Sequence, residues 1–227
     1  MGARPLVVRH TGSHAVEEYL EAIHRFGATA EGASTTGLAE HLGVAPASVT
    51  GMLRRLRETG LITYRKYGEF ALTAEGEARA HNLIRRHRLA ERLLTDVLKV
   101  PLEEAHDEAC RLEHALSPQL EARLATALGS PESCPHGHPI DAAAEDHTLP
   151  LADLPENRRA VIARLEDETP ARVRYLSERG LVPGARVVVR KRDSLGEVLV
   201  VEVNGQTHSL ALALARTLRI RRPGGAK

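Results

Sequence analysis

The chain of 227 residues can hold one large domain or two to three small ones. Its apolar fraction of 42% and charged fraction of 27% are typical of a globular protein in water, and its formal net charge of +1 excludes a global positive field. No apolar run is long enough to span a membrane and no secretory signal is recognisable, so we expect a cytoplasmic protein without a membrane partner.

The first predicted region, residues 1–73, has the pattern of a winged helix-turn-helix DNA-binding domain. Gly43 supplies a tight turn between two short helices, and a hairpin of two short strands follows them. The expected elements are helices over 13–26, 35–42 and 46–59 and strands over 61–64 and 69–72.

The second helix of this motif and the turn of the hairpin carry local positive charge. A recognition helix enters the major groove with its N-terminal residues near base edges, where Ser48 and Thr50 stand. The arginines of the helix and Lys66 of the hairpin suit phosphates. A winged helix used only for packing or protein contacts is the alternative, and the local charge favours DNA. The expected DNA-contacting residues are Ala47, Ser48, Thr50, Gly51, Arg54, Arg55, Arg65 and Lys66.

Residues 74–142 are predicted to form a helical domain for metal binding and dimerisation. A long helix over 73–98 is followed by a short joint, so the next helix, over 102–116, is expected to lie antiparallel to it. A third helix is expected over 117–128. These helices are rich in leucine but too narrow to bury all of it, which predicts a homodimer surface.

The helix over 102–116 gathers metal-ligand types on one side. Four of its side chains fall within roughly 100° of arc at 100° per residue. They are His106, Cys110, Glu113 and His114. His87 and Glu91 share a face of the preceding helix and are expected opposite His106. A thiolate, carboxylates and imidazoles together indicate a first-row transition metal, and a polar helix face with one core cysteine is the alternative.

The rest of the chain is expected to be a flexible linker over 143–156 and a small β-barrel with one inserted helix over 157–227. The expected elements are strands over 160–165, 185–190, 197–203, 206–210 and 217–220 and a helix over 170–179. Before the linker, Cys134, His136 and His138 could form a zinc site. No second group of ligands follows at the spacing of a zinc motif, so a rigid loop is favoured. Both Cys110 and Cys134 are expected as free thiols or ligands rather than as a disulfide.

Two blocks of the middle region, at 87–96 and 106–114, resemble the metal-dependent repressors of the diphtheria toxin repressor and manganese transport regulator family. The resemblance extends from about residue 14 to 221 and includes Pro-Ala-Ser-Val-Thr at 46–50 and Gly-His-Pro-Ile at 137–140. It implies a mainly α fold with little β structure, namely a winged helix-turn-helix, a helical dimerisation domain and a C-terminal small β-barrel similar to FeoA. It also implies a homodimer that binds a palindromic operator in double-stranded DNA when loaded with metal.

The resemblance further implies up to two metal ions per subunit. The principal site of the family matches Glu18, Cys110, Glu113 and His114 in this chain. The second site resembles His87, Glu91 and His106, and Glu168 falls where the C-terminal domain adds a carboxylate. Ala171 falls at the position of an amide ligand and cannot bind, and Gly51 stands where iron regulators often have a base-reading glutamine.

The expected metal is Mn²⁺, with Fe²⁺ next. Iron-type members have Met at position 18 and Cys at 110, whereas manganese-type members have carboxylates at both and another at Glu21, so this chain is a hybrid. Carboxylates are hard ligands and favour Mn²⁺, whereas the thiolate is a soft ligand and favours a softer ion. The implied function is repression of metal-uptake genes, without catalysis and without an organic cofactor. A metallohydrolase and a winged-helix regulator of an organic ligand stay open, although no HExxH or nucleophile motif appears.

Overall fold

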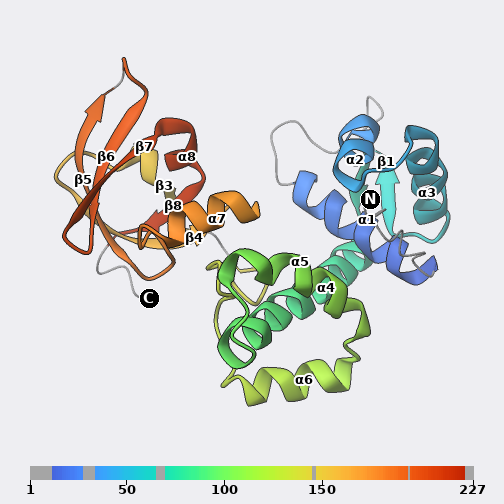
Figure 1. The fold of residues 1–227 in the computed structure, drawn as a ribbon. Coiled ribbons are helices and arrows are strands. Elements are labelled where there is room, and N and C mark those ends of the chain that lie inside the picture. Colours follow the sequence, from blue (N-terminus) through green and yellow to red (C-terminus); the bar gives the residue numbers. More distant parts are fainter. Residues whose placement is uncertain (1–11, 28–33, 65–69, 145–146, 194, 223–227) are drawn as a thin grey trace, which may run out of the picture. The chain divides into compact units, whose positions relative to one another are not determined.

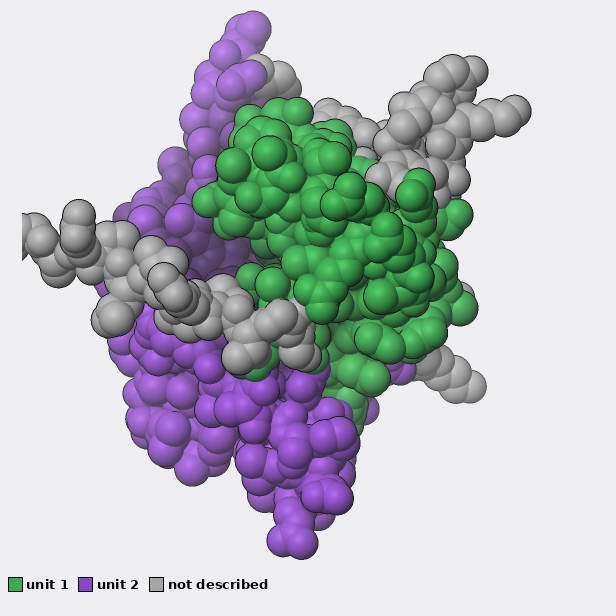
Figure 2. All heavy atoms as spheres, turned by 90° about the vertical axis from the view of Figure 1, so that its right-hand side faces the viewer, with its two compact units in different colours: residues 1–85 green, residues 86–227 purple. Residues whose placement is uncertain are grey.

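The computed structural model describes residues 12–27, 34–64, 70–144, 147–193 and 195–222 (Figure 1). The chain divides into two compact units, unit 1 with residues 1–85 and unit 2 with residues 86–227 (Figure 2). Helix α4 (Ala74–Arg92) begins in unit 1 and ends in unit 2. Among the described residues, no helix combines the length and the apolar character that crossing a membrane requires.

Unit 1 has the order of elements predicted for a winged helix-turn-helix. They are α1 (Gly12–Gly27), α2 (Thr35–Leu42), α3 (Pro46–Glu58), β1 (Ile62–Tyr64), β2 (Phe70–Leu72) and the start of α4. The hydroxyl of Ser34 accepts a hydrogen bond from the backbone of Gly37 and so caps α2. Gly43 ends α2 with a φ of +63°, a left-handed conformation that glycine adopts without strain.

The apolar side of α3 fixes which side chains of the recognition helix remain outside. Val49, Leu53 and Leu56 are buried in the core of unit 1, together with side chains of α1 and β1. Ser48, Thr50, Arg54 and Arg55, which lie between or beside these three, are exposed. The two strands pair antiparallel with Thr63 opposite Ala71, and the turn between them, with Arg65 and Lys66, lies outside the described residues.

The helical part of unit 2 differs from the prediction in how its helices end. The predicted long helix becomes a π-helical turn, η2 (Leu93–Val97), after α4. The next helix, α5 (Leu102–Leu112), ends earlier than expected and tightens into a 3-10 turn, η3 (Glu113–Ala115). Helix α6 (Pro118–Ala127) follows. The early end of α5 matters because two of the predicted ligands then lie on the 3-10 turn and not on the helix.

The C-terminal part of unit 2 is a six-stranded antiparallel sheet in the order β3-β8-β4-β5-β6-β7. The elements are β3 (Leu149–Pro150), η4 (Leu151–Asp153), β4 (Arg159–Leu165), α7 (Pro170–Ser177), β5 (Arg186–Asp193), β6 (Val198–Val203), β7 (Gln206–Ala211), α8 (Leu212–Arg216) and β8 (Leu218–Arg221). Asn204 and Gly205 both have positive φ and connect β6 to β7, and an Asn-Gly pair is a strong hairpin signal in a sequence.

Two features of the sheet differ from the sequence expectation. Residues 149–154, part of the expected linker, form β3 and η4, because Leu151 and Ala152 are buried in the same core as the strands. A second short helix, α8, stands beside the one expected helix. Its leucines and alanines alternate and follow β7 directly. Because no glycine or proline separates the two elements, the sequence alone cannot distinguish this helix from a longer strand.

Within unit 2 the sheet is joined to the helical part through α5 and through the loop before β3. Leu102 of α5 packs on the core of the sheet, and Arg174 of α7 lies 3.0 Å from Glu103. Gly137 has a φ of +92°, and a Cβ at this position would lie 2.0 Å from the carbonyl oxygen of Ala163 on β4. Only glycine allows the loop to approach the strand so closely.

Candidate metal centre

The predicted ligands of α4 and α5 meet inside unit 2. His87 and Glu91 lie one turn apart on α4, and their atoms Nε2 and Oε1 are 3.3 Å apart. The rings of His87 and His106 meet edge to face, with their centroids 4.8 Å apart. His87 and Glu91 are 6% and 1% exposed, so this polar group sits in an interior where unpaired charge is costly.

The thiol and the carboxylate of the predicted principal site surround the same imidazole. Nδ1 of His87 lies 2.6 Å from Oε2 of Glu113. Sγ of Cys110 lies 4.0 Å from Nδ1 of His87 and 3.8 Å from Nε2 of His106. Nε2 of His114 lies 3.4 Å from Oε1 of Glu113. The two sets of ligands that the family resemblance separates are therefore continuous here through His87.

The sheet contributes a carboxylate to this group. Oε2 of Glu168, between β4 and α7, lies 2.6 Å from Nδ1 of His106, and Oε1 lies 3.0 Å from Nε2 of His138. His87, Glu91, His106 and Glu168 each offer one ligand atom within 4.8 Å of the others. We call His87, Glu91, His106, Cys110, Glu113 and Glu168 the buried centre, because His87, Glu91 and Glu113 are buried, whereas His106 and Glu168 are partly buried and Cys110 is exposed at its edge.

The loop before β3 adds residues that the sequence analysis favoured as a rigid loop. His136 is fully buried, with Nδ1 2.9 Å from Oε1 of Glu91 and Nε2 3.1 Å from the carbonyl oxygen of Leu102. Cys134, also buried, forms a further group with His136 and Glu91 in which the ligand atoms lie within 4.8 Å. The signal available in the sequence was the close spacing of Cys134, His136 and His138, but it could not indicate Glu91 as the partner.

Charge is balanced by imidazoles and carboxylates in direct contact. Burial alone would lower the pKa of His87, but Cys110, Glu113 and Glu91 together raise it well above its usual value. Burial is likewise outweighed at His106, where Cys110 and Glu168 raise the pKa to about 12. Burial would raise the pKa of Glu91, and the neighbouring imidazoles hold it well below its usual value. Metal binding would replace imidazole protons, since only neutral imidazole is a ligand.

The two thiols differ in their surroundings. Burial would raise the pKa of Cys110, but the imidazoles of His106 and His87 lower it. Burial and the charge of Glu91 raise the pKa of Cys134 well above its usual value. Both cysteines are free, as expected. The surroundings of Cys110 therefore favour the thiolate, which is the form that binds a metal, whereas those of Cys134 disfavour it.

Three polar atoms of the buried centre are suited to coordinate a cation because they form no hydrogen bonds with one another. Nε2 of His87, Nδ1 of His106 and Oε2 of Glu91 are buried and have no partner with hydrogen-bond geometry among the described residues. This holds although Nδ1 of His106 lies within ion-pair distance of Glu168. Buried polar atoms that face each other without hydrogen bonds are costly, and coordination of a metal by nitrogen, oxygen and sulfur would satisfy them.

The predicted ligands of α1 lie in unit 1, and the structure describes them only within that unit. Glu18 is half-buried on α1, and Oε1 of Glu21 lies 3.5 Å from Arg25 one turn further on. Ala171 of α7 has no ligand atom, as the sequence indicated. The structure thus brings together the predicted ligands of unit 2, whereas a role for Glu18 and Glu21 stays a prediction.

The recognition helix presents its predicted residues to solvent. Ala47, Ser48, Thr50, Arg54 and Arg55 are exposed and Gly51 is half-buried. The hydroxyl of Thr50 donates to the carbonyl oxygen of Pro46 over 3.1 Å, so it is already used within the helix. Ser48 and the two arginines are therefore the stronger candidates for contacts with bases and phosphates.

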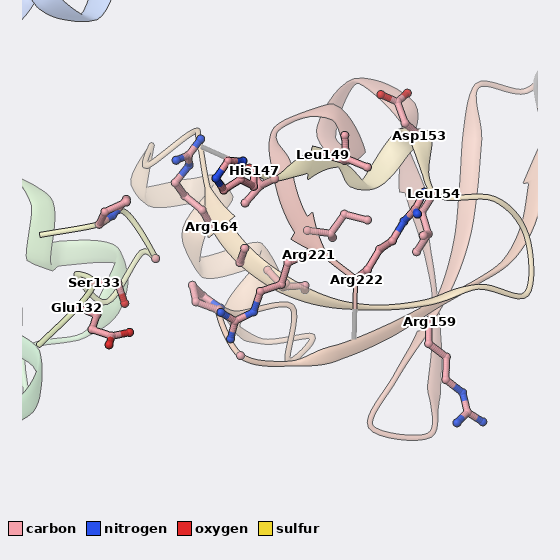
Figure 3. Close-up of a pocket in the computed structure, with 18 of the residues that line it drawn as sticks. Glu132, Ser133, His147, Leu149, Asp153, Leu154, Arg159, Arg164, Arg221 and Arg222 are labelled. Carbon is pink, nitrogen blue, oxygen red and sulfur yellow. The ribbon is translucent and has the colours of Figure 1, made fainter. Parts of the chain in front are cut away.

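A cavity of about 1460 Å³ also lies in unit 2, beside β4 and β8. Figure 3 shows the labelled Arg159, Arg164, Arg221 and Arg222 among its lining residues, with Glu132 and Asp153. Guanidinium groups stay protonated and have no lone pair to offer a metal. No residue of the buried centre lines this cavity, although Cys134 of the neighbouring group does.

Three family profiles match consecutive parts of the chain. Residues 13–70 match the N-terminal DNA binding domain of iron dependent repressors, and residues 73–142 match their metal binding and dimerisation domain. Residues 149–222 match the FeoA domain. The order of the three profiles agrees with the predicted fold class, and the last begins at the strand β3 that the sequence analysis had placed in the linker.

Relatives of known function match nearly the whole chain. The iron-dependent repressor IdeR of Mycobacterium leprae is 34% identical over 200 residues, which are 81% of this chain and 86% of that protein. The diphtheria toxin repressor of Corynebacterium diphtheriae is 28% identical over 218 residues, 90% of this chain and 95% of that one. A solved manganese-dependent transcriptional repressor in complex with manganese has a TM-score of 0.83 at 30% identity, covering 92% of this chain and 100% of that chain. These relatives are transcriptional repressors and not enzymes.

Proposed function

The chain belongs to the iron-dependent repressor family, as a metal-dependent DNA-binding regulator, and we propose that it represses metal-uptake genes as a homodimer on a palindromic operator. Such an operator lies on cytoplasmic DNA, so this proposal includes a cytoplasmic location. The observation that carries the proposal is the buried centre, where three buried polar atoms lack hydrogen-bond partners among the described residues. Coordination of a cation would satisfy these atoms.

We propose two ions per subunit, held by neighbouring sets of residues. The first set is Glu18, Cys110, Glu113 and His114, with Glu21 beside it on α1. The second set is His87, Glu91, His106 and Glu168. The contact of 2.6 Å between His87 and Glu113 supports coupling between the two sets, because occupancy of one changes the charge that the other meets.

We propose Mn²⁺ as the ion that activates the protein, with Fe²⁺ as the next choice. Carboxylates of Glu18, Glu91, Glu113 and Glu168 suit a hard ion, and the thiolate of Cys110 suits a softer one. Relatives named for iron and a structure with bound manganese both lie at about 30% identity, so identity alone favours neither metal. The number of carboxylates decides our choice.

In this proposal the ligands join the two units through α1 and α4. Glu18 stands on α1 of the DNA-binding unit, whereas the remaining ligands stand on unit 2. The bound ions supply positive charge that favours the arrangement in which all these ligands converge. That arrangement would hold the recognition helices of a dimer about one DNA turn apart, roughly 34 Å. A coupling of about 1–3 kcal/mol would change operator affinity 5–150-fold.

Substitution of one ligand in each unit tests the proposal. Glu18→Ala and His114→Ala should weaken operator binding in excess Mn²⁺ to the level of the chelated protein. Glu40→Ala, which removes an exposed carboxylate of α2, is the matched control and should bind like the wild type. Operator affinity that is unchanged in both ligand variants would contradict the proposed sites.

A further inference from the structure

A second group of ligand-type side chains lies in unit 1, where α1 meets α4. His24 comes from the last turn of α1, and Glu77 and His81 lie one turn apart near the start of α4. One ligand atom of each residue lies within 4.8 Å of the other two. We call these three residues the α1–α4 trio. It shares no residue with the buried centre, which belongs to unit 2.

Both imidazoles of the trio face the same carboxylate oxygen. Oε2 of Glu77 lies 2.7 Å from Nδ1 of His24 and 3.5 Å from Nε2 of His81. The two rings meet edge to face at 88°, with their centroids 4.8 Å apart. His81 reaches this oxygen from the next turn of α4, whereas His24 reaches it from α1, so the two helices bring three ligand types to one point.

The separations in the trio are those of ligands around one small cation. Zn²⁺ with bonds of about 2.0–2.1 Å in tetrahedral geometry places its ligand atoms roughly 3.3 Å apart. The measured separations of 2.7 and 3.5 Å lie on either side of that value. The two printed separations are therefore already close to the spacing that one ion requires, and the third is below 4.8 Å.

Exposure of the trio leaves room for exchange with solvent. The side chains of His24, Glu77 and His81 are 27%, 42% and 29% exposed. A metal held by three protein ligands needs water in its fourth position, and a half-exposed group provides it. In the buried centre, by comparison, His87 and Glu91 are only 6% and 1% exposed, so most of its ligand atoms are less open to solvent than those of the trio.

We propose that His24, Glu77 and His81 form a separate site for a late first-row divalent cation, with Zn²⁺ as the ion of best fit. Two imidazoles and one carboxylate are a nitrogen-rich set that suits Zn²⁺ better than Mn²⁺. The ion connects α1 to α4 within unit 1. Because α1 also carries Glu18 and Glu21, occupancy of the trio restrains the helix that presents those carboxylates.

The number of Zn²⁺ ions per chain tests this site in the full-length protein. After equilibration with Zn²⁺ and gel filtration, elemental analysis should give one Zn²⁺ fewer in His24→Asn/His81→Asn than in the wild type. His41→Asn is the matched control, because His41 is an exposed imidazole of α2 outside the trio, and it should match the wild type. Equal Zn²⁺ content in all three proteins overturns the proposal.

A second variant and a chemical measurement distinguish loss of the Zn²⁺ site from loss of the fold. Glu77→Gln removes the carboxylate charge and keeps an acceptor for His24, so it should lose the same Zn²⁺ ion while its circular dichroism stays unchanged. Zn²⁺ should also protect His24 and His81, but not His41, from acylation by diethylpyrocarbonate. Failure of Zn²⁺ to protect His24 and His81 overturns the proposal whatever the buried centre binds.

Discussion

The two ends of helix α4 place glutamates in opposite surroundings. Glu75 of the first turn is exposed in unit 1 and pairs with Arg79 over 2.5 Å, and Glu77 beside it is half-exposed. Glu91 near the last turn is 1% exposed in unit 2, among His87 and His136. Only the buried end leaves polar atoms without hydrogen-bond partners among the described residues. Both ends use the same residue types, so burial is what distinguishes the regulatory cation site that we propose at one end from the accessible site that we propose at the other.

The largest expected effect is on stability, from removing the buried carboxylate. Glu91→Ala leaves buried imidazoles without their counter-charge, and breaking a buried pair in this way costs about 3–5 kcal/mol. Urea unfolding of the chelated protein at neutral pH measures this change in the free energy of unfolding. Glu75→Ala on the same helix is the matched control, and it should have little effect because exposed ion pairs contribute little. Equal effects of the two variants would remove the contrast between the ends of α4.

The next effect is on metal affinity, through the carboxylate from the sheet. Glu168→Gln keeps the shape of the side chain but removes the charge next to His106 and His138, and we expect Mn²⁺ affinity to fall about 10–100-fold. Competition with a fluorescent chelator measures it. Glu166→Gln, two residues earlier and paired with Arg164, should leave the affinity unchanged. A fall of the same size in both variants would show that general charge, and not coordination, is responsible.

A smaller effect is expected at the exposed charges of α3. Arg54→Ala and Arg55→Ala should each weaken binding to all DNA sequences and lower the slope of affinity against salt by about 1. Fluorescence anisotropy over a series of salt concentrations gives the slope. Arg79→Ala removes an exposed arginine of α4 as the control. If the slope is the same in all variants, α3 does not contact phosphates.

The smallest effect is expected at a single exposed hydroxyl. Ser48→Ala should change the preference at one operator position by about 1 kcal/mol and leave the salt slope unchanged. Thr50→Val should change it less, because the hydroxyl of Thr50 already donates to Pro46. Binding to a set of operators with single base changes separates the two. A larger change from Thr50→Val would reverse our order of the two residues.

Most of the fold could be predicted from the sequence, because it follows from local signals. Gly43 between two short helices predicted the helix-turn-helix, and the Asn204-Gly205 dipeptide indicates the hairpin between β6 and β7. The two elements without a local signal were missed. Strand β3 has two residues and forms only because it pairs with β8, and α8 continues directly from β7.

The candidate site could be predicted where its ligands share a helix, and less well where tertiary contacts assemble it. Cys110 and His106 are one turn apart on α5, so their juxtaposition follows from helix geometry. His136 meets Glu91 only because Gly137 lets its loop approach β4. His24 and Glu77 are 53 residues apart, and nothing in their local sequence indicates that they meet.

Operator binding by one preparation of the full-length protein, with and without its metal, tests the central claim most directly. Fluorescence anisotropy with a labelled operator should show that the chelated protein binds weakly and that Mn²⁺, or Fe²⁺ without oxygen, raises the affinity 5–150-fold. The same affinity in the chelated and the loaded protein would contradict control of DNA binding by the buried centre.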